Sequence, residues 1–296
     1  MAAKIIDGKA IAEQIRNEVR RETEQLKAER GFVPGLAFIL VGENPASQVY
    51  VRMKGKACEE AGFHSITERL PATVPEQVLL DKVAQFNNDP KIHGLLIQLP
   101  LPRHINEQRV IESIDPEKDV DGFHPINIGR LVIGLDTFKS CTPAGIQELL
   151  MRSGNDPSGK HVVVVGRSTI VGKPVANILL QKQAGANAVV TVAHTGATDL
   201  LPYTKSADIL IVAVGKAEVI TGDMLKEGAV VIDVGINRVE DPSAKSGYRI
   251  VGDVHFASAS KVAGAITPVP GGVGPMTIAM LLTNTLKAAK KVRTSV

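Results

Sequence analysis

The sequence predicts an α/β protein whose parallel sheets are covered by helices on both faces. Short apolar segments typical of buried strands alternate with amphipathic helical segments along almost the whole chain. The chain has 296 residues, of which 44% are hydrophobic, and this is enough for two domains that each bury a core. Strands separated by helices form βαβ units, and such units build parallel sheets.

The first half of the chain is expected to form a small sheet with its helices. Residues 8–30 have the apolar spacing of an amphipathic helix that ends at Gly31. Asn44 and Pro45 supply the N-cap and the first-turn proline of a helix that runs to about residue 62. The other elements expected here are strands 35–42, 64–70 and 93–99, helices 75–87 and 106–113, and an acidic loop at 115–123.

The second half is expected to form a larger parallel sheet. Its most strand-like segment, 161–166, contains four consecutive valines, and a helix is expected after Thr142 and Pro143. The other expected elements are helix 172–183, strands 188–193, 207–215, 229–235 and 264–269, and a last helix at 275–291. If this last helix packs on the first domain, the domains are 1–140 plus 275–296, and 141–274.

Composition excludes several kinds of partner and site. The net charge is only +3, aromatic residues make up 3%, and Trp is absent, so nucleic acid is not an expected partner. Cys58 and Cys141 lie far apart and the seven histidines are scattered, so neither a disulfide framework nor a metal site is expected. The chain has no signal-peptide pattern and no apolar run of about 18 residues. We therefore expect a cytoplasmic protein that does not enter a membrane.

A glycine turn after the valine strand is a candidate nucleotide site. Ligands of open α/β sheets bind at the carboxyl ends of strands, where a helix N-terminus offers N–H groups to phosphate. Gly166 and Gly172 allow close approach of the backbone, Arg167 adds charge, and Ser168 adds a hydroxyl group. The spacing is neither GxGxxG nor a P-loop, and an ordinary strand–turn–helix that needs glycine for tight packing is the alternative.

The residues after this turn favour NADP over NAD. NAD sites place an acidic residue about 20 residues beyond the glycines to bind the ribose 2′-hydroxyl group. No acidic residue lies between His161 and Thr198. The second strand ends instead at His194 and Thr195, and Arg167 is close enough in sequence to reach a 2′-phosphate.

A second candidate site combines a helix with the end of a neighbouring strand. Tyr50 and Lys54 are four residues apart and so lie on one helical face, where they could bind a flat polar ring and transfer a proton. A solvated lysine beside a half-packed tyrosine is the alternative. Gln98 ends the strand before two prolines and points either into a crevice or to water.

Two further segments carry candidate binding residues. Asp121, in KDVDGF, could accept two hydrogen bonds from an aminopyrimidine edge, whereas Asp119 is expected to stabilise a local turn. The segment from Pro268 to Thr277 has three glycines among three prolines. It could form a second edge of a ligand site or serve as a hinge.

Together these segments resemble a known family. VGENPASQVYVRMKGKACEEAG, FNNDPKIHGLLIQLPLP, DPEKDVDGFHP, VVVVGRSTIVGKP and TPVPGGVGPMT are similar to the bifunctional methylenetetrahydrofolate dehydrogenase/methenyltetrahydrofolate cyclohydrolase proteins of bacterial type. The resemblance extends from the first helix to about residue 290. It implies a three-layer α/β substrate domain, a Rossmann-like cofactor domain, and a last helix that returns to the first domain.

The resemblance also implies roles for individual residues. Lys54 would be the acid–base group of the cyclohydrolase, Tyr50 would stack on the folate ring, Gln98 would orient Lys54, and Asp121 would bind the nitrogen edge of the pterin. Pro270 and Gly271 would lie at the substrate. Thr195 stands where a serine is common, and its hydroxyl group is retained. The implied NADP site consists of Gly166, Arg167, Ser168, Thr195 and Ile236.

The activity that the resemblance implies has two steps. 5,10-Methylenetetrahydrofolate is oxidised to 5,10-methenyltetrahydrofolate with NADP, and the product is hydrolysed to 10-formyltetrahydrofolate, in one-carbon metabolism. A homodimer formed through the cofactor domain is also implied. The alternatives are a monofunctional NADP-dependent dehydrogenase and a non-catalytic nucleotide-binding regulatory protein of the same fold.

Overall fold

The computed structural model describes residues 2–244 and 247–292, and the chain divides into two compact units. Unit 1 contains Met1–Ala12 and Thr142–Thr277, and unit 2 contains Glu13–Cys141 and Ile278–Val296. Residues 1–12 therefore group with the second half of the chain rather than with the expected first domain. The reason is that β1 (Lys4–Ile5) pairs with β11 (Ala265–Ile266). Residues 293–296 of the expected first domain lie outside the described residues.

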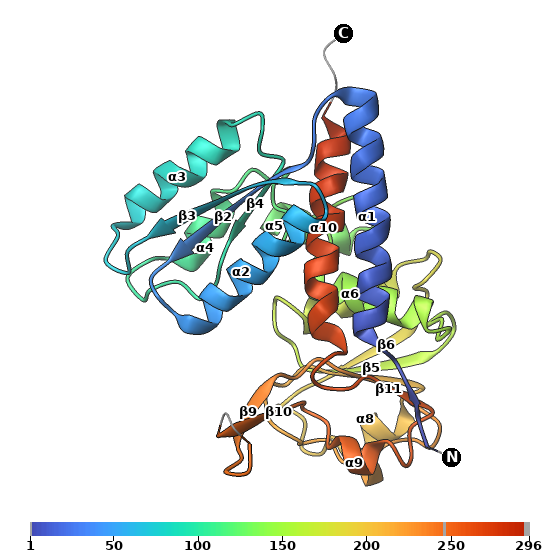
Figure 1. Ribbon diagram of the computed structural model, residues 1–296. Coiled ribbons are helices and arrows are strands. Elements are labelled where there is room, and N and C mark those ends of the chain that lie inside the picture. Colours follow the sequence, from blue (N-terminus) through green and yellow to red (C-terminus); the bar gives the residue numbers. More distant parts are fainter. Residues whose placement is uncertain (1, 245–246, 293–296) are drawn as a thin grey trace. The chain divides into compact units, whose positions relative to one another are not determined.

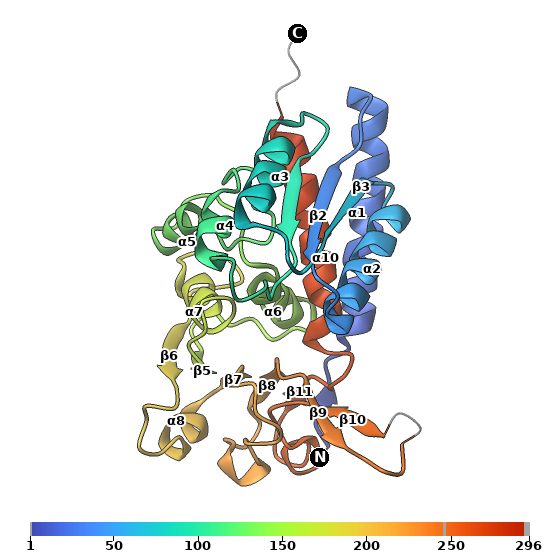
Figure 2. The ribbon, with the colours of Figure 1, turned by 90° about the vertical axis from the view of Figure 1, so that its left-hand side faces the viewer.

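Unit 2 is built on a three-stranded parallel sheet in the order β3-β2-β4. All seven residues of the central strand are buried, as its uninterrupted apolar sequence predicts. In Figure 2, α3 and α4 lie on one face of this sheet and α2 on the other. The elements of this unit are β2 (Gly35–Val41), α2 (Pro45–Glu60), β3 (His64–Leu70), α3 (Glu76–Asn88), β4 (Gly94–Ile97), α4 (Glu107–Glu112) and α5 (Pro125–Val132).

The first and last long helices of the chain, α1 (Gly8–Arg30) and α10 (Val273–Lys291), lie side by side (Figures 1 and 2). Lys290 forms an ion pair with Glu22, and Arg30 Nη1 donates to the carbonyl oxygen of Lys290 at 3.1 Å. The expected return of the last helix to the first part of the chain is confirmed.

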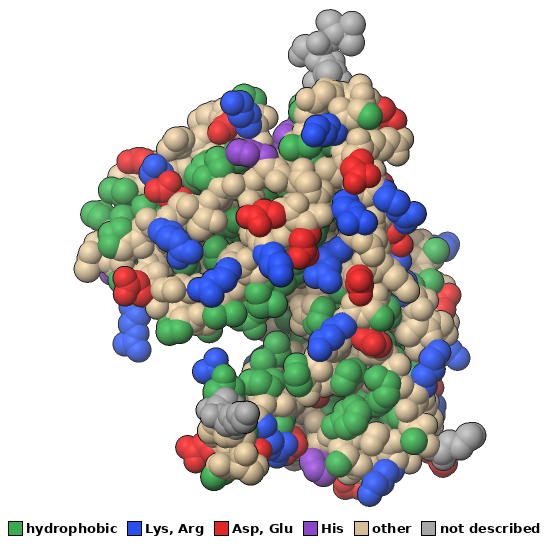
Figure 3. Space-filling model, in the orientation of Figure 1, with side chains coloured by type: hydrophobic (Ala, Val, Ile, Leu, Met, Phe, Trp, Pro, Cys, Tyr) green, Lys and Arg blue, Asp and Glu red, His purple; other side chains and the backbone are tan. Residues whose placement is uncertain are grey.

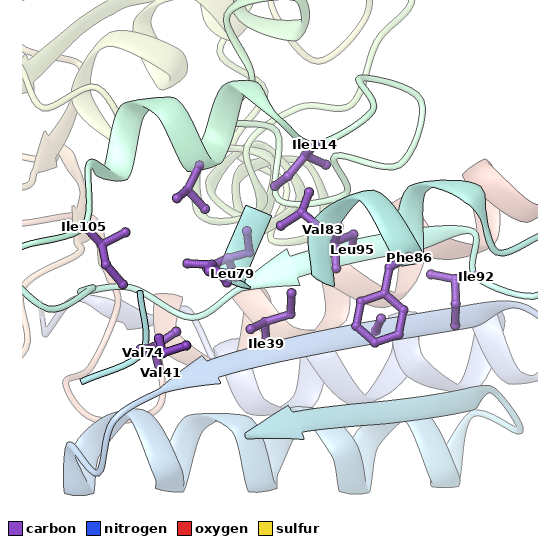
Figure 4. Packing of buried hydrophobic residues seen from close by; sticks show 13 residues of the cluster. Ile39, Val41, Val74, Leu79, Val83, Phe86, Ile92, Leu95, Ile105 and Ile114 are labelled. Carbon is purple, nitrogen blue, oxygen red and sulfur yellow. The ribbon is translucent and has the colours of Figure 1, made fainter. Parts of the chain in front are cut away.

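One hydrophobic core cluster of unit 2 lies between the sheet and α3 (Figure 4). Ile39 and Leu95 point from the sheet towards Leu79, Val83 and Phe86 of α3, and all five side chains are at most 5% exposed. Each such side chain contributes roughly 1.5–3 kcal/mol by leaving water. This packing fixes the ends of the strands that carry the candidate site.

Unit 1 contains a six-stranded parallel sheet in the order β1-β11-β8-β7-β5-β6. The strand order reverses at β5, which has β6 on one side and β7 on the other, so the loop after β5 lies at a topological switch point. The elements of this unit not bounded above are α6 (Cys141–Arg152, which begins at the unit boundary), β5 (His161–Val165), α7 (Gly172–Leu180), β6 (Val189–Ala193), α8 (Leu201–Ser206), β7 (Ile209–Val212), the 3₁₀ helix η1 (Gly222–Met224), β8 (Val230–Asp233), β9 (Asn237–Glu240), β10 (Tyr248–Val251) and α9 (Phe256–Ala259).

The predicted α/β class is confirmed, but several elements differ from the expectation. The antiparallel β9–β10 hairpin was not expected. Helix α5 was also not expected; His124 Nδ1 accepts from the N–H of Ile126 at its start. Strand β4 ends at Ile97 rather than 99, and β7 ends at Val212 rather than 215.

The surface shown in Figure 3 carries Lys and Arg side chains interspersed with Asp and Glu side chains. This distribution agrees with the small net charge of +3. Within the part of the chain that the structure describes, no helix is long and apolar enough to cross a membrane.

Candidate active site

Lys54 and Gln98 are brought together in unit 2. Lys54 lies on α2 and is only 8% exposed, and Gln98 directly follows β4. Lys54 Nζ donates to Gln98 Oε1 at 3.1 Å, and Gln98 Nε2 donates to the carbonyl oxygen of Leu99 at 2.8 Å. The second bond fixes the amide so that its oxygen faces the lysine. The alternative of a solvated lysine is therefore wrong.

Tyr50 lies one helical turn before Lys54 and is 43% exposed. The helix begins at Pro45, where the Asn44 side chain accepts from the N–H of Ser47 at 3.1 Å, as the expected N-cap should. The start of the helix is thus fixed, and an accessible phenol lies one turn from a buried ammonium group.

Asp121 is held in a turn that is stabilised by its neighbours. Asp119 is 1% exposed and accepts from the N–H groups of Gly122 and Phe123, each at 3.2 Å, and of His124 at 2.8 Å. Asn127 Nδ2 also donates to Asp119, at 2.8 Å. Asp119 therefore stabilises the turn, as expected. Asp121 and Asp119 both line a small cavity whose other lining residues are apolar.

The segment around Asp121 is also tied to α10. Asn284 Nδ2 donates to the carbonyl oxygens of Val120 at 2.8 Å and Lys139 at 2.9 Å. A Cβ atom on Gly122 would lie 2.6 Å from the backbone nitrogen of Ser140, so only glycine allows this approach. These contacts hold the turn at one place relative to the helix.

The positive charge of Lys54 influences the pKa values of Asp121 and Cys141. Burial raises the pKa of Asp121, the positive charge of Lys54 opposes that rise, and the charge of Asp119 adds to it. Burial, followed by the charge of Asp121, raises the pKa of the Cys141 thiol. Burial also raises the pKa of Cys58 to about 12. The site therefore combines an ammonium group, an amide and a carboxyl group with two thiols that stay protonated at neutral pH.

The glycine turn lies at the switch point of the sheet in unit 1. Gly166 has φ +128°, and a Cβ atom there would lie 2.2 Å from the carbonyl oxygen of Ala213. A Cβ atom on Gly172 would lie 2.3 Å from the carbonyl oxygen of Gly166. Backbone packing requires glycine at both positions, as the alternative of an ordinary, tightly packed strand–turn–helix predicts. The turn also lies where open α/β sheets bind their ligands.

Polar groups near this turn are suited to a phosphate. Ser168 Oγ accepts from the N–H groups of Val171 at 3.2 Å and Gly172 at 3.3 Å, so its own O–H remains able to donate. Arg167 and Thr195 are exposed after β5 and β6, at the same edge of the sheet. The donor set consists of cationic and hydroxyl groups and fits a phosphorylated dinucleotide.

The remaining candidates lie in loops of unit 1. Ile236 is 55% exposed between β8 and β9. Pro270 is exposed, and Gly271 accepts from the N–H of Lys9 at 3.1 Å. Gly8 packs so closely there that a Cβ atom would lie 1.8 Å from the carbonyl oxygen of Gly272. These loops therefore have a fixed backbone.

The sequence did not point to Cys141 as a neighbour of Asp121, nor to the buried pair Asp233 and Asp253 described below. Their spacing in the sequence carries no pattern, because tertiary contacts alone bring them to their sites. Over the described ranges 2–244 and 247–292, no group of three or more His, Cys, Asp or Glu side chains could hold a metal ion.

Comparison with known families decides the relationship. Residues 6–121 match the catalytic domain of tetrahydrofolate dehydrogenase/cyclohydrolase, and residues 140–293 match the NAD(P)-binding domain of the same family. The chain belongs to the tetrahydrofolate dehydrogenase/cyclohydrolase family. Tetrahydrofolate dehydrogenase/cyclohydrolases combine these two domains in one chain, which agrees with the two units.

Individual members of the tetrahydrofolate dehydrogenase/cyclohydrolase family are similar over almost their full length. Bifunctional protein FolD of Moorella thermoacetica is 60% identical, with 98% of this chain and 100% of that protein covered. The protein of the same name from Syntrophobacter fumaroxidans is 58% identical, with 98% of each chain covered.

Solved structures of the family agree with the fold. The FolD enzyme of Campylobacter jejuni has a TM-score of 0.92 at 49% identity, with 98% of this chain and 99% of that chain covered. The FolD enzyme of Trypanosoma brucei, solved with NADP cofactor and inhibitor, has a TM-score of 0.92 at 42% identity, with 98% of each chain covered.

Proposed function

We propose that the chain oxidises 5,10-methylenetetrahydrofolate to 5,10-methenyltetrahydrofolate with NADP and then hydrolyses the product to 10-formyltetrahydrofolate. Membership of the dehydrogenase/cyclohydrolase family supports both reactions. The observation that carries the assignment of the hydrolytic step is the buried Lys54, whose Nζ lies 3.1 Å from Gln98 Oε1. A dehydrogenase alone needs no such proton-transfer group.

The oxidation step needs alignment more than acid–base catalysis. NADP, when bound, accepts the hydride from the one-carbon bridge. The folate nitrogens stabilise the cation that forms, so the protein has to hold the reacting groups at about 3–3.5 Å. We assign Gly166, Arg167, Ser168, Thr195 and Ile236 to the dinucleotide, because they lie in loops at the carboxyl ends of β5, β6 and β8.

The hydrolysis step requires two proton movements. Water adds to the cationic one-carbon bridge and loses a proton; then the bond between that carbon and N5 breaks as the new hydroxyl proton moves to N5. One proton is released overall. In this proposal Lys54 relays these protons, and Gln98 holds its amine in place.

Substrate binding is assigned to groups around Lys54. Asp121 would accept hydrogen bonds from the amino and ring N–H groups of the pterin, and Tyr50 would stack on the ring. We also assign Pro270 and Gly271 to the substrate, as their place between β11 and α10 leaves Pro270 exposed.

The substitution Lys54→Met tests the hydrolytic assignment, and Lys56→Met is the matched control. Lys56 lies on the same helix, but its side chain is 75% exposed and forms an ion pair with Glu60 at 3.7 Å. Lys54→Met should lower methenyltetrahydrofolate hydrolysis by about 10²-fold or more, because proton-transfer groups contribute about 10²–10⁴-fold. Hydride transfer should remain measurable in both variants. Hydrolysis by Lys54→Met at the parent rate would overturn the assignment.

We further propose a cytoplasmic homodimer. Both cysteines are buried free thiols, which suits a reducing compartment. Strand β6 is the edge of its sheet and exposes Val189 by 65% and Val192 by 40%. An apolar strand edge of this kind is suited to pairing with a second copy. Sedimentation velocity that finds only monomer would contradict this.

A further inference from the structure

Two carboxylates that the mechanism does not use are buried at the carboxyl edge of the sheet in unit 1. Asp233 is 3% exposed at the end of β8, and Asp253 is 0% exposed two residues after β10. Burial of a carboxylate is unfavourable unless hydrogen bonds replace its water. The hydrogen-bond donors of both carboxylates therefore indicate which segments each carboxylate holds in place.

Asp253 connects the loops that follow two neighbouring strands. Its Oδ2 atom accepts from the N–H groups of Val214 at 2.7 Å and Gly215 at 2.9 Å, directly after β7. Its Oδ1 atom accepts from Asn237 Nδ2 at 2.9 Å, and Asn237 directly follows Ile236 at the end of the loop after β8. The N–H of Ala213, the first residue after β7, still donates to the carbonyl oxygen of Val165 in β5 at 2.8 Å. The two N–H groups that follow bind the Asp253 carboxylate instead of a strand.

Asp233 holds Asp253 in place. Asp233 Oδ1 accepts from the N–H groups of Gly235 and Asp253, each at 2.9 Å, and Oδ2 accepts from that of Val254 at 3.0 Å. The pair leaves no space for other side chains: a Cβ atom on Gly252 would lie 1.8 Å from Asp233 Oδ2. The two carboxylates thus form a closed and fully bonded cluster.

We propose that Asp253 is a positioning residue for the dinucleotide, and that Asp233 supports it. Strands β5, β7 and β8 are adjacent, so the loops that Asp253 joins lie beside the Gly166 turn, at the edge where such folds bind dinucleotides. By binding Gly215 and Asn237, the residue next to Ile236, the carboxylate orders the two loops before the cofactor binds, and this removes an ordering cost from binding. This inference rests on the proposed function, which places NADP at this edge.

Asp253→Ala tests the proposal. It removes the acceptor of three hydrogen bonds, and we expect the Kd for NADP, measured by calorimetry, and the KM for NADP to rise roughly tenfold or more. We expect kcat at saturating NADP to change less than the KM. Methenyltetrahydrofolate hydrolysis, assayed without dinucleotide, should stay within about twofold of the parent, because Lys54 belongs to unit 2.

A charge-exchange variant separates positioning from general stability. In Asp253→Asn/Asn237→Asp, the new amide oxygen can accept from Val214 and Gly215 while its NH₂ group donates to the new carboxylate. We expect it to recover most of the NADP affinity. If Asp253→Ala does not fold, Asn237→Ala, which removes one of the three bonds, should give a smaller rise in Kd.

The NADP-binding measurements distinguish failure of the positioning role of Asp253 from failure of the proposed function. If the parent protein does not bind NADP, the proposed function fails. If the parent binds NADP and Asp253→Ala binds it equally well, only the inference fails. The inference also fails if Asp253→Ala lowers both activities equally, or if the exchange variant binds NADP no better than Asp253→Ala.

Discussion

Replacement of Gly166 by alanine tests the link between the backbone of the glycine turn and dinucleotide binding. Gly166 has φ +128°, which side chains other than hydrogen rarely allow, and this strain costs about 1–3 kcal/mol. The new Cβ atom would also lie 2.2 Å from the carbonyl oxygen of Ala213. Moving packed backbone to relieve such an overlap adds about 1–3 kcal/mol. The expected loss of stability is therefore roughly 2–6 kcal/mol.

Gly154→Ala is the matched control for this variant. Gly154 also lies in unit 1 and has a positive φ of +81°, but nothing lies within 4 Å of its Cβ position. It should cost only about 1–2 kcal/mol, the strain of a left-handed residue. The difference in stability between the two variants therefore reports mainly the overlap with Ala213.

Urea unfolding and initial rates of both reactions provide the assay. Gly166→Ala should be less stable than Gly154→Ala and should have a KM for NADP raised by about tenfold or more, because the turn must move away from Ala213. Hydrolysis of methenyltetrahydrofolate should persist under conditions where the variant is folded. The reasoning is refuted if the two variants are equally stable and Gly166→Ala retains the parent KM for NADP.

Two further predictions concern unit 1. Arg167→Ala should raise the KM for NADP by roughly 10–100-fold, because a charge-assisted bond to the 2′-phosphate is lost, and should leave the KM for NAD almost unchanged. The control is Lys182→Ala, which removes another exposed cation. Equal changes in the two KM values, or the same effect from Lys182→Ala, would exclude a role of Arg167 at the 2′-phosphate. Burial, opposed by three backbone N–H donors and reinforced by the charge of Asp253, raises the pKa of Asp233 from 3.8 to about 6. The folded protein therefore binds the proton more tightly, so this group's contribution to stability falls as pH rises from about 4 to about 6. Relative to Asp233→Asn, the parent should gain about 1 kcal/mol of unfolding free energy from pH 7 to pH 5 in urea titrations, and an identical pH dependence in both proteins would contradict this.

The sequence predicts the candidate site only in part. The i, i+4 spacing of Tyr50 and Lys54 places them on one helical face, but that spacing is equally compatible with a solvated lysine. Burial of Lys54 and its bond to Gln98 depend on the packing of α2 and β4 against the same central strand. Side chains 44 residues apart carry no local pattern that reports their contact.

The sequence by itself determined the α/β class, the order of most strands and helices, and the glycine turn after the valine strand, because these depend on local periodicity and on residues with special backbone freedom. Only the tertiary structure decided that β1 joins the larger sheet, that β9 and β10 form an antiparallel hairpin, and that Asp253 joins the loops after β7 and β8. Such features depend on hydrogen bonds between groups that are distant in sequence, and no local pattern in the sequence reports which of these groups pair.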